Sequence, residues 1–145
     1  MPFNSRELLA RMIKCEAGGE GENGMRAVAT VIMNRVHVAE GEYMRVNMGN
    51  LRDVLFQQYQ FDCARTTLYG MYNPQNIFDI NPEPIHFEIA DWALAGGQFN
   101  GVANSLWYYN PFGSCSDFFP NQNGQFHNRI NLHCFYTPTA SYAET

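Results

Sequence analysis

The segment NSRELLARMIKCEAGGEGENGMRAVATVIMNRV, residues 4–36, decides the fold because it encodes two helices joined by a glycine-rich turn. Asn4 with Glu7 three residues later forms a capping-box pattern, which marks a helix start. The pair Gly18-Gly19 marks the end of that helix, since glycine is common just beyond a helix. From about Gly24 to Val36 most residues are apolar, so we expect a second helix that is largely buried.

The rest of the chain predicts a mostly helical α+β domain with short aromatic strands. Asn50-Leu51-Arg52-Asp53 predicts a short third helix, and Pro84 suits the first turn of a fourth, which ends at Gly96-Gly97. The aromatic runs at 106–109 and 134–136 are typical of strands. Segments 38–50 and 72–84 are predicted as loops, the second of them exposed. We expect one domain over residues 1–145, with a core at about 4–138 and a loose tail at 139–145.

Composition excludes several classes of protein. The chain has 145 residues, 46% of them hydrophobic, and therefore enough apolar side chains for a core. No apolar run approaches the ~18 residues of a membrane span. Nine dispersed Lys and Arg against fourteen Asp and Glu give a net charge of −5, which argues against nucleic acid as a partner. The N-terminus lacks the basic and apolar regions of a secretory signal, so we expect synthesis in the cytoplasm without one.

The cysteines and histidines do not have the spacing of a metal site, and we expect no metal and no cofactor. Packed thiols are the simplest interpretation of the four cysteines, which are Cys15, Cys63, Cys115 and Cys134. Cys115 and Cys134 flank a short segment, so a disulfide between these two stays open.

Glu16 is the candidate catalytic residue. With about 100° of rotation per helical residue and Leu8 set at zero, Met12 lies at roughly 40° and Glu16 at roughly 80° around the axis. The carboxyl therefore lies within the apolar stripe of the first helix. Loss of hydration there raises a carboxyl pKa, and such a group can act as a general acid near neutral pH.

A structural alternative stands beside this interpretation. Glu16 could instead pair with Arg35 or Arg65, or reach solvent at the helix end. Glu20 and Glu22 lie in the glycine-rich turn beyond the helix, where solvated loop charges are the simpler interpretation.

Aromatic and amide side chains gather at residues 56–61 and 107–110. They combine flat apolar faces with hydrogen-bonding groups, as a sugar-binding cleft requires, although aromatic residues also dominate protein cores. The candidates for substrate contact are Gln60, Phe61, Trp107, Tyr108 and Tyr109.

These residues together resemble the SleB/CwlJ family of bacterial cell-wall hydrolases. The family pattern Glu-Ala-x-Gly-Glu, followed by a buried helix that ends in Asn-Arg, matches residues 16–20 and 34–35. Supporting matches are Gln60-Phe61, the stretch 106–111 and the ending His133-Cys134-Phe135-Tyr136. A cysteine after the Asn-Pro turn, here Cys115, favours the CwlJ branch. Cys15 departs from the pattern, because relatives often have glycine or alanine there, and segment 72–84 has no counterpart in the family.

The resemblance implies a lysozyme-like fold related to lytic transglycosylases, with Glu16 as the catalytic acid. It implies cleavage of the bond from N-acetylmuramic acid to N-acetylglucosamine in peptidoglycan glycan strands, with 1,6-anhydro products. Two alternatives stay open. One is a muramidase-type hydrolase that uses Glu20 as a second carboxylate, and the other is a peptidoglycan-binding module without turnover.

The resemblance also implies where the protein acts. Family members reach the wall as spore-coat enzymes that lyse the spore cortex during germination, and a phage lysis protein or virion component would also need no signal. We therefore expect action at the cell wall, with a spore-coat or virion protein as a candidate partner.

Overall fold

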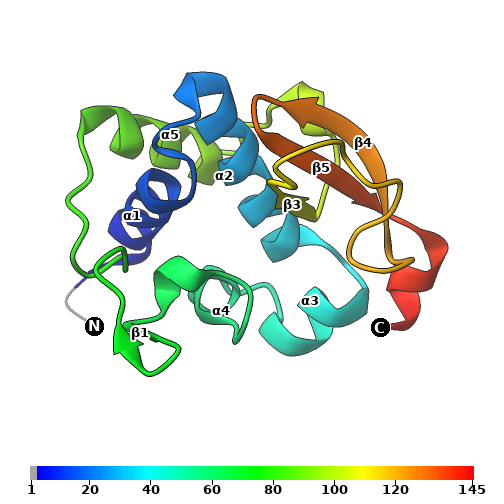
Figure 1. Cartoon of the computed structure of the whole chain (residues 1–145), viewed down its shortest axis with the longest axis horizontal. Helices are drawn as coiled ribbons and strands as arrows, with labels where there is room; N and C mark the ends of the chain where they lie inside the picture. The colour runs from blue at the N-terminus through cyan, green and yellow to red at the C-terminus, as the bar shows by residue number, and fades with distance from the viewer. Residues whose placement is uncertain (1–2) are drawn as a thin grey trace.

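The computed structural model describes residues 3–145, with helices on one side and a three-stranded sheet on the other (Figure 1). The expected α+β class is confirmed. The α-helices are α1 (Ser5–Ala17), α2 (Gly21–His37), α3 (Gly41–Asn47), α4 (Leu51–Phe56) and α5 (Pro84–Leu94). The short 3-10 helices are η1 (Asp62–Ala64), η2 (Asn100–Val102) and η3 (Ala140–Glu144). The strands are β1 (Thr67–Leu68), β2 (Met71–Tyr72), β3 (Trp107–Tyr109), β4 (Gly124–Ile130) and β5 (His133–Pro138).

Side-chain caps begin the helices where the sequence predicts them. The side chain of Asn4 accepts a hydrogen bond from the backbone N–H of Glu7 over 2.9 Å, and Asn50 does the same for Asp53 over 3.0 Å. Such bonds satisfy backbone donors that have no partner inside the helix. Pro84 opens α5 as expected. The predicted limits of α1 and α5 and the predicted start of α4 are confirmed to within a residue or two.

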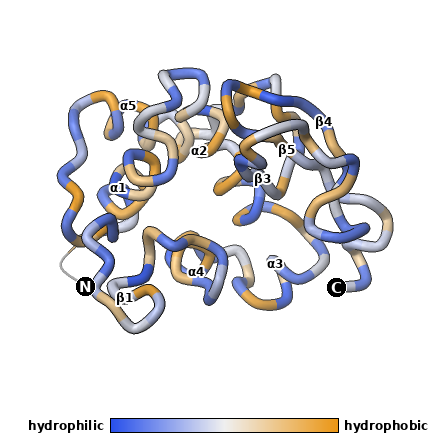
Figure 2. Tube along the Cα trace, in the orientation of Figure 1, coloured by the Kyte–Doolittle hydropathy of each residue, from blue (hydrophilic) through white to orange (hydrophobic). Residues whose placement is uncertain are grey.

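Helix α2 lies at the centre of the fold and packs against α1, α3, α4 and α5 and against the sheet. Its contact with α1 and α5 forms the main core, in which Leu8, Met12, Ile32 and Ile89 are fully buried. Hydrophobic residues accordingly alternate with polar ones along α1 and α5 in Figure 2. The opposite side of α2 packs on the sheet, where Phe135 of β5 is fully buried. The central helix therefore joins the helical side of the fold to the strand side.

The sheet is antiparallel, with strand order β3-β5-β4. Tyr108 pairs with Phe135, and Tyr109 pairs with Cys134. Strand β5 lies in the middle and is mostly buried, whereas β4 is an edge strand whose residues are largely exposed and hydrophilic (Figure 2). Strands β1 and β2 form a separate small hairpin. The sequence predicted β3 and β5 and missed β1, β2 and β4.

Two segments are more ordered than predicted. The predicted loop at 38–50 contains helix α3, which buries Tyr43 and Asn47. The predicted loose tail at 139–145 forms η3, and Tyr142 there is only 2% exposed. The hydroxyl of Tyr142 accepts a hydrogen bond from the backbone N–H of Tyr43 over 3.1 Å. The tail prediction is therefore wrong, because an aromatic side chain anchors the tail to α3.

Segment 72–84 is irregular, as predicted, but it is not simply exposed. Asn73, Asn76 and Ile77 are buried. The guanidinium of Arg11, itself 6% exposed, donates hydrogen bonds from α1 to the backbone carbonyls of Ile77, over 2.9 Å, and of Ile80. These bonds fasten the segment to the first helix.

The expectation of packed thiols is wrong for all four cysteines. Cys15 at the end of α1 forms a disulfide with Cys63 of η1, and Cys115 forms one with Cys134 of β5. The fold places the end of α1 beside η1, which the spacing of the cysteines along the chain did not show.

Within residues 3–145, no helix is both long enough and apolar enough to cross a membrane. The same residues contain no cluster of His, Cys, Asp and Glu side chains that could hold a metal ion.

Candidate active site

The carboxyl of Glu16 lies in the last turn of α1, between β3 and η1. The hydroxyl of Tyr108 donates a hydrogen bond of 2.6 Å to its Oε1 atom. The Sγ atom of Cys63 lies 2.9 Å from its Oε2 atom. Each carboxyl oxygen of the partly buried Glu16 therefore has its own neighbour.

Burial is the main influence on the protonation of this group. It raises the pKa of Glu16 above the ordinary value for glutamate, while the Tyr108 hydrogen bond and the positive charge of Arg35 act in the opposite direction. The charge of Asp62 adds to the rise. Among the described residues no arginine lies within ion-pair distance of Glu16, so neither the Arg35 nor the Arg65 alternative holds. The net effect is a raised pKa, which is the direction that loss of hydration on the apolar stripe of α1 produces.

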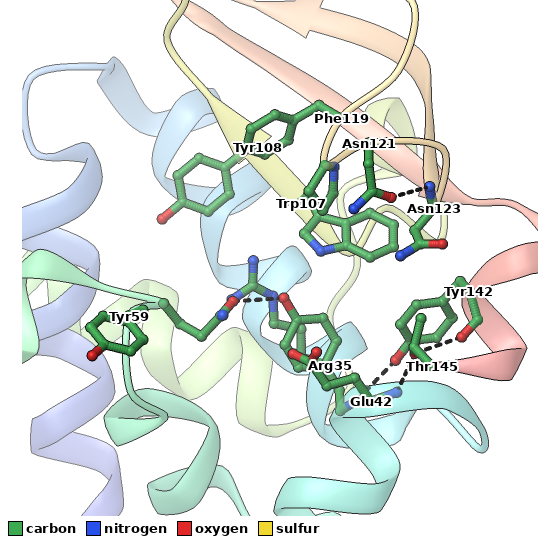
Figure 3. A pocket seen from close by; sticks show the side chains of 13 residues that line it. Arg35, Glu42, Tyr59, Trp107, Tyr108, Phe119, Asn121, Asn123, Tyr142 and Thr145 are labelled. Carbon is green, nitrogen blue, oxygen red and sulfur yellow. Dashed lines mark hydrogen bonds between the residues drawn. The ribbon is translucent and has the colours of Figure 1, made fainter.

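A cavity of about 400 Å³ opens beside Tyr108. Trp107 and Tyr108 reach it from β3, and Arg35 approaches from α2 (Figure 3). The ring of Tyr108 lines the cavity, and its hydroxyl donates a hydrogen bond to Glu16. The Glu16 carboxyl is therefore behind Tyr108 and is not itself part of the cavity lining. The other lining residues are Glu42, Tyr43, Tyr59, Gln60, Phe119, Pro120, Asn121, Asn123, Tyr142 and Thr145.

Three of the five predicted contact residues line this cavity, namely Gln60, Trp107 and Tyr108. Phe61 does not, because its side chain is buried in the core with only 3% exposed. Tyr109 does not either, and its half-buried ring stacks on Phe119 at 4.2 Å between ring centroids. The structure therefore places these two residues outside the cavity, and their contact with substrate stays a prediction.

Arg35 organises the floor of the cavity. It is 5% exposed, and its Nε donates to the backbone carbonyl of Leu106 over 2.7 Å. Its guanidinium lies 4.6 Å from the ring centroid of Tyr43. The side-chain oxygen of Gln60 accepts hydrogen bonds from the hydroxyl of Tyr43, over 2.7 Å, and from Nη1 of Arg35, over 3.3 Å. The buried cation therefore fixes an amide and a phenol at the cavity wall.

The sequence did not predict the part of the cavity wall that comes from the loop before β4 and from the C-terminal tail. Asn121 and Asn123 come from the loop before β4, and Tyr142 and Thr145 come from the tail. Nothing in the local pattern marks these residues, because they reach the cavity only after the sheet and η3 have formed.

Glu20, the candidate second carboxylate, is held by the turn between β4 and β5. Its Oε1 accepts a hydrogen bond from the backbone N–H of Leu132 over 3.3 Å and lies 3.0 Å from Nδ1 of His133. Its side chain is 12% exposed, so it is not a solvated loop charge. Burial lowers the pKa of His133, while the charge of Glu20 raises it. Glu22 does lie at the surface, paired with Arg26 at 2.8 Å.

The chain belongs to the cell wall hydrolase family, whose model matches residues 19–136. It is therefore an enzyme that acts on the cell wall. At the level of individual proteins, it is 32% identical to the cell wall hydrolase CwlJ of Bacillus subtilis strain 168 over 143 residues. That alignment covers 95% of this chain and 88% of the relative. The CwlJ of Oceanobacillus iheyensis is 30% identical over 141 residues, with 93% and 87% covered.

Solved structures support the expected fold. One is the catalytic domain of the germination-specific lytic transglycosylase SleB from Bacillus anthracis, with a TM-score of 0.66 and 23% identity over 94% of this chain and 97% of that chain. The catalytic domain of SleB from Bacillus cereus gives a TM-score of 0.64 at 23% identity, over 92% and 89%. At this identity the likeness establishes the fold, and the resemblance stated from the sequence motifs is confirmed at the level of family.

Proposed function

We propose that this enzyme cleaves the bond from N-acetylmuramic acid to N-acetylglucosamine in peptidoglycan, as a lytic transglycosylase with Glu16 as its catalytic residue. The observation that carries the proposal is the environment of Glu16. Burial raises the pKa of its carboxyl, and Tyr108 fixes one of its two oxygens. A protonated and oriented carboxyl is what general-acid cleavage of a glycosidic bond requires.

In the first step Glu16 gives its proton to the glycosidic oxygen. Because Oε1 accepts the hydrogen bond from Tyr108, the transferable proton is carried by Oε2. The bond from the muramic C1 to the leaving oxygen breaks, and positive charge develops on the muramic sugar. Glu16 becomes a carboxylate, and the Tyr108 bond strengthens because hydrogen bonds to charged acceptors are the stronger ones.

In the second step the Glu16 carboxylate takes the proton from the 6-hydroxyl of the same sugar. The freed oxygen bonds to C1, and a 1,6-anhydro product leaves. The proton lost in the first step is thereby restored, and water takes no part. One carboxyl group suffices for the whole cycle.

The position of Glu20 supports a mechanism with one carboxylate. Hydrolysing glycosidases place two carboxyl groups on either side of the scissile bond. The Glu20 carboxylate is occupied by Leu132 and His133 at the turn between β4 and β5. A hydrolase that uses Glu20 is the second candidate, since this is the nearest acidic residue along the chain after Glu16.

The cavity beside Tyr108 is the proposed sugar site. Its volume of about 400 Å³ lies in the range of about 300–1,000 Å³ that is common for ligand pockets. Trp107 is only 6% exposed and forms part of the apolar wall, whereas the ring of Tyr59, 75% exposed, offers an apolar face to a sugar ring. The amides of Gln60, Asn121 and Asn123 offer hydrogen bonds. This combination suits a glycan, whose rings have apolar faces and polar edges.

The test is digestion of purified peptidoglycan by the wild-type protein and by Glu16→Gln, a variant that keeps the shape and loses the titratable proton. We expect the wild type to release 1,6-anhydro muropeptides. The rate of the variant should be lower by a factor of about 10²–10⁴, the usual contribution of general acid–base catalysis. Mass analysis separates the two candidate reactions. Products that carry an added water would establish hydrolysis instead, and Glu20→Gln would then be inactive too.

Co-sedimentation with walls provides the control for binding. Glu16→Gln should sediment with insoluble peptidoglycan as the wild type does, because the proposed sugar site is left intact. If the wild-type protein sediments but releases no sugars, the protein is a binding module rather than an enzyme with this activity.

We also propose the spore cortex as the wall on which this enzyme acts, delivered by a spore-coat protein. The support is the germination-specific relative of the same fold and the similarity to CwlJ. Release of muropeptides from isolated cortex should be faster than from vegetative walls. Equal or slower release from cortex would favour the phage or virion alternative.

A further inference from the structure

The Cys15–Cys63 disulfide lies against the candidate catalytic carboxyl. Cys15 directly precedes Glu16 in α1, and Cys63 belongs to η1, which faces the end of that helix. The sulfur of Cys63 is 2.9 Å from Oε2 of Glu16, on the oxygen that Tyr108 leaves free. One covalent bridge therefore restrains the backbone at Glu16 and also contacts its side chain.

The bridge is buried at Cys63 and half-buried at Cys15. Cys63 is 7% exposed, and its backbone carbonyl accepts a hydrogen bond from the N–H of Ile77 over 2.8 Å. The sulfur of Cys15 lies 3.0 Å from the backbone carbonyl of Gln75. Asn73 donates hydrogen bonds to the carbonyls of Asp62, the first residue of η1, and of Arg65, which follows that helix. Segment 72–84 thus contacts both residues of the bridge.

The chemistry of a disulfide sulfur suits this place. It carries no hydrogen, so it cannot donate a hydrogen bond that would stabilise a Glu16 carboxylate, and sulfur is a weak acceptor that holds a carboxyl proton only loosely. A thiol, a hydroxyl or a water molecule in the same place would donate to Oε2 and favour the ionised carboxyl. The remaining charged or titratable groups that act on Glu16 are Tyr108 from β3, Arg35 from α2 and Asp62 from η1.

We propose that the Cys15–Cys63 disulfide is a positioning element of the active site, which ties the end of α1 to η1 and keeps hydrogen-bond donors away from Oε2 of Glu16, so that this oxygen retains its proton. The inference rests on the proposed role of Glu16. The enzyme is then fully active only in its oxidised form.

The experiment compares two disulfide-free variants of the whole chain, Cys15→Ala/Cys63→Ala and the matched control Cys115→Ala/Cys134→Ala. Each is assayed on purified peptidoglycan for kcat, KM and the pH profile of kcat, with circular dichroism to establish folding. Wild type treated with a mild thiol reductant serves as a third sample. Glu16→Gln is run in parallel, because its inactivity tests the role of Glu16 independently of the bridge.

We expect Cys15→Ala/Cys63→Ala to lose at least tenfold in kcat with little change in KM. The alkaline limb of its pH profile should move to lower pH, because water that replaces the sulfur lowers the pKa of Glu16. Reduced wild type should shift in the same direction. The control variant removes a disulfide that does not contact Glu16, so its alkaline limb should stay in place even if its stability falls.

A Cys15→Ala/Cys63→Ala protein with the wild-type kcat and pH profile would overturn the inference, as would equal shifts in both variants. If this variant does not fold and reduced wild type is also unfolded, the bridge is a scaffold and the inference fails as well. If Glu16→Gln is active, the proposed function fails rather than the bridge alone.

Discussion

Replacement of Tyr108 by phenylalanine tests the hydrogen bond that joins the cavity to the candidate acid. The variant keeps the ring that lines the cavity and touches His133, at 5.1 Å between ring centroids, and removes the hydroxyl that donates to Glu16. A hydrogen bond between neutral groups contributes about 0.5–1.5 kcal/mol, and one to a charged group about 1.5–3 kcal/mol. Glu16 is neutral before proton transfer and develops negative charge during it. Only the difference, about 1–1.5 kcal/mol, therefore affects the rate.

This difference corresponds to a loss of roughly tenfold in kcat, at about 1.36 kcal/mol per factor of ten. The pH profile should change in a distinctive way. The Tyr108 bond lowers the pKa of Glu16, so its removal raises that pKa and moves the alkaline limb of kcat to higher pH. The expected variant is slower but stays protonated, and hence active, further into the alkaline range.

The assay is the release of soluble muropeptides from purified walls between pH 4 and 9, followed by reducing-end or mass analysis. Tyr109→Phe is the matched control, because its hydroxyl bonds to Ser116 rather than to Glu16. The reasoning is refuted if Tyr108→Phe keeps the wild-type rate and profile. It is also refuted if the alkaline limb moves to lower pH.

Three further outcomes concern stability and are checked by denaturant unfolding. Glu16→Gln should be more stable than wild type at neutral pH and similar to it below about pH 4. The raised pKa of Glu16 means that the folded state binds its proton more tightly than the unfolded state does, so the stability of the wild type falls as pH rises above about 4.3. A stability difference that is constant at all pH values would contradict this. Loss of the Cys115–Cys134 disulfide, which spans 19 residues, should lower the free energy of unfolding by about 3 kcal/mol. An unchanged denaturant midpoint would contradict this, because it would mean that the disulfide does not restrict the unfolded chain. Gly41→Ala should cost about 2–4 kcal/mol, because φ is +76° there and a Cβ atom would lie 2.4 Å from the ring of Tyr142; a cost below 1 kcal/mol would show that the ring can move aside.

Local signals in the sequence were enough to predict most of the helices. Asn4 and Asn50 act on backbone groups three residues away, and glycine and proline act at the point where they occur, so these limits need no tertiary information. Helix α3 escaped prediction because its sequence, GEYMRVN, has few apolar residues, and its stability comes from burial of Tyr43 beside Tyr142 and Trp107. That contact depends on the fold of the tail.

Strand β4 was not predicted for a different reason. Its residues, GQFHNRI, are mostly exposed, so they lack the alternation of polar and apolar side chains by which a strand is predicted. The strand is specified instead by its backbone pairing with β5, from Gly124 opposite Pro138 to Ile130 opposite His133. Because only Asn131 and Leu132 separate the two strands, this pairing is local, but backbone pairing leaves no periodic side-chain pattern in an exposed edge strand.

For the candidate site, the helical position of Glu16 was predictable because it depends only on the 3.6-residue repeat. The neighbours of its carboxyl were not. Tyr108 was expected to contact substrate, and the structure directs its hydroxyl to Glu16 while its ring lines the cavity. The contact with Cys63 depends on where η1 lies after folding.

The attachment of segment 72–84 to α1 has a consequence for how such chains can vary. Arg11 is nearly inaccessible to water, and the backbone carbonyls of Ile77 and Ile80 supply its acceptors together with the carboxylate of Glu7. A homologue that shortened this stretch but kept the arginine would leave a desolvated cation with too few acceptors, which is strongly destabilising. The stretch and the arginine should therefore be kept or lost together during divergence, and any engineered deletion of the stretch needs an apolar residue at position 11.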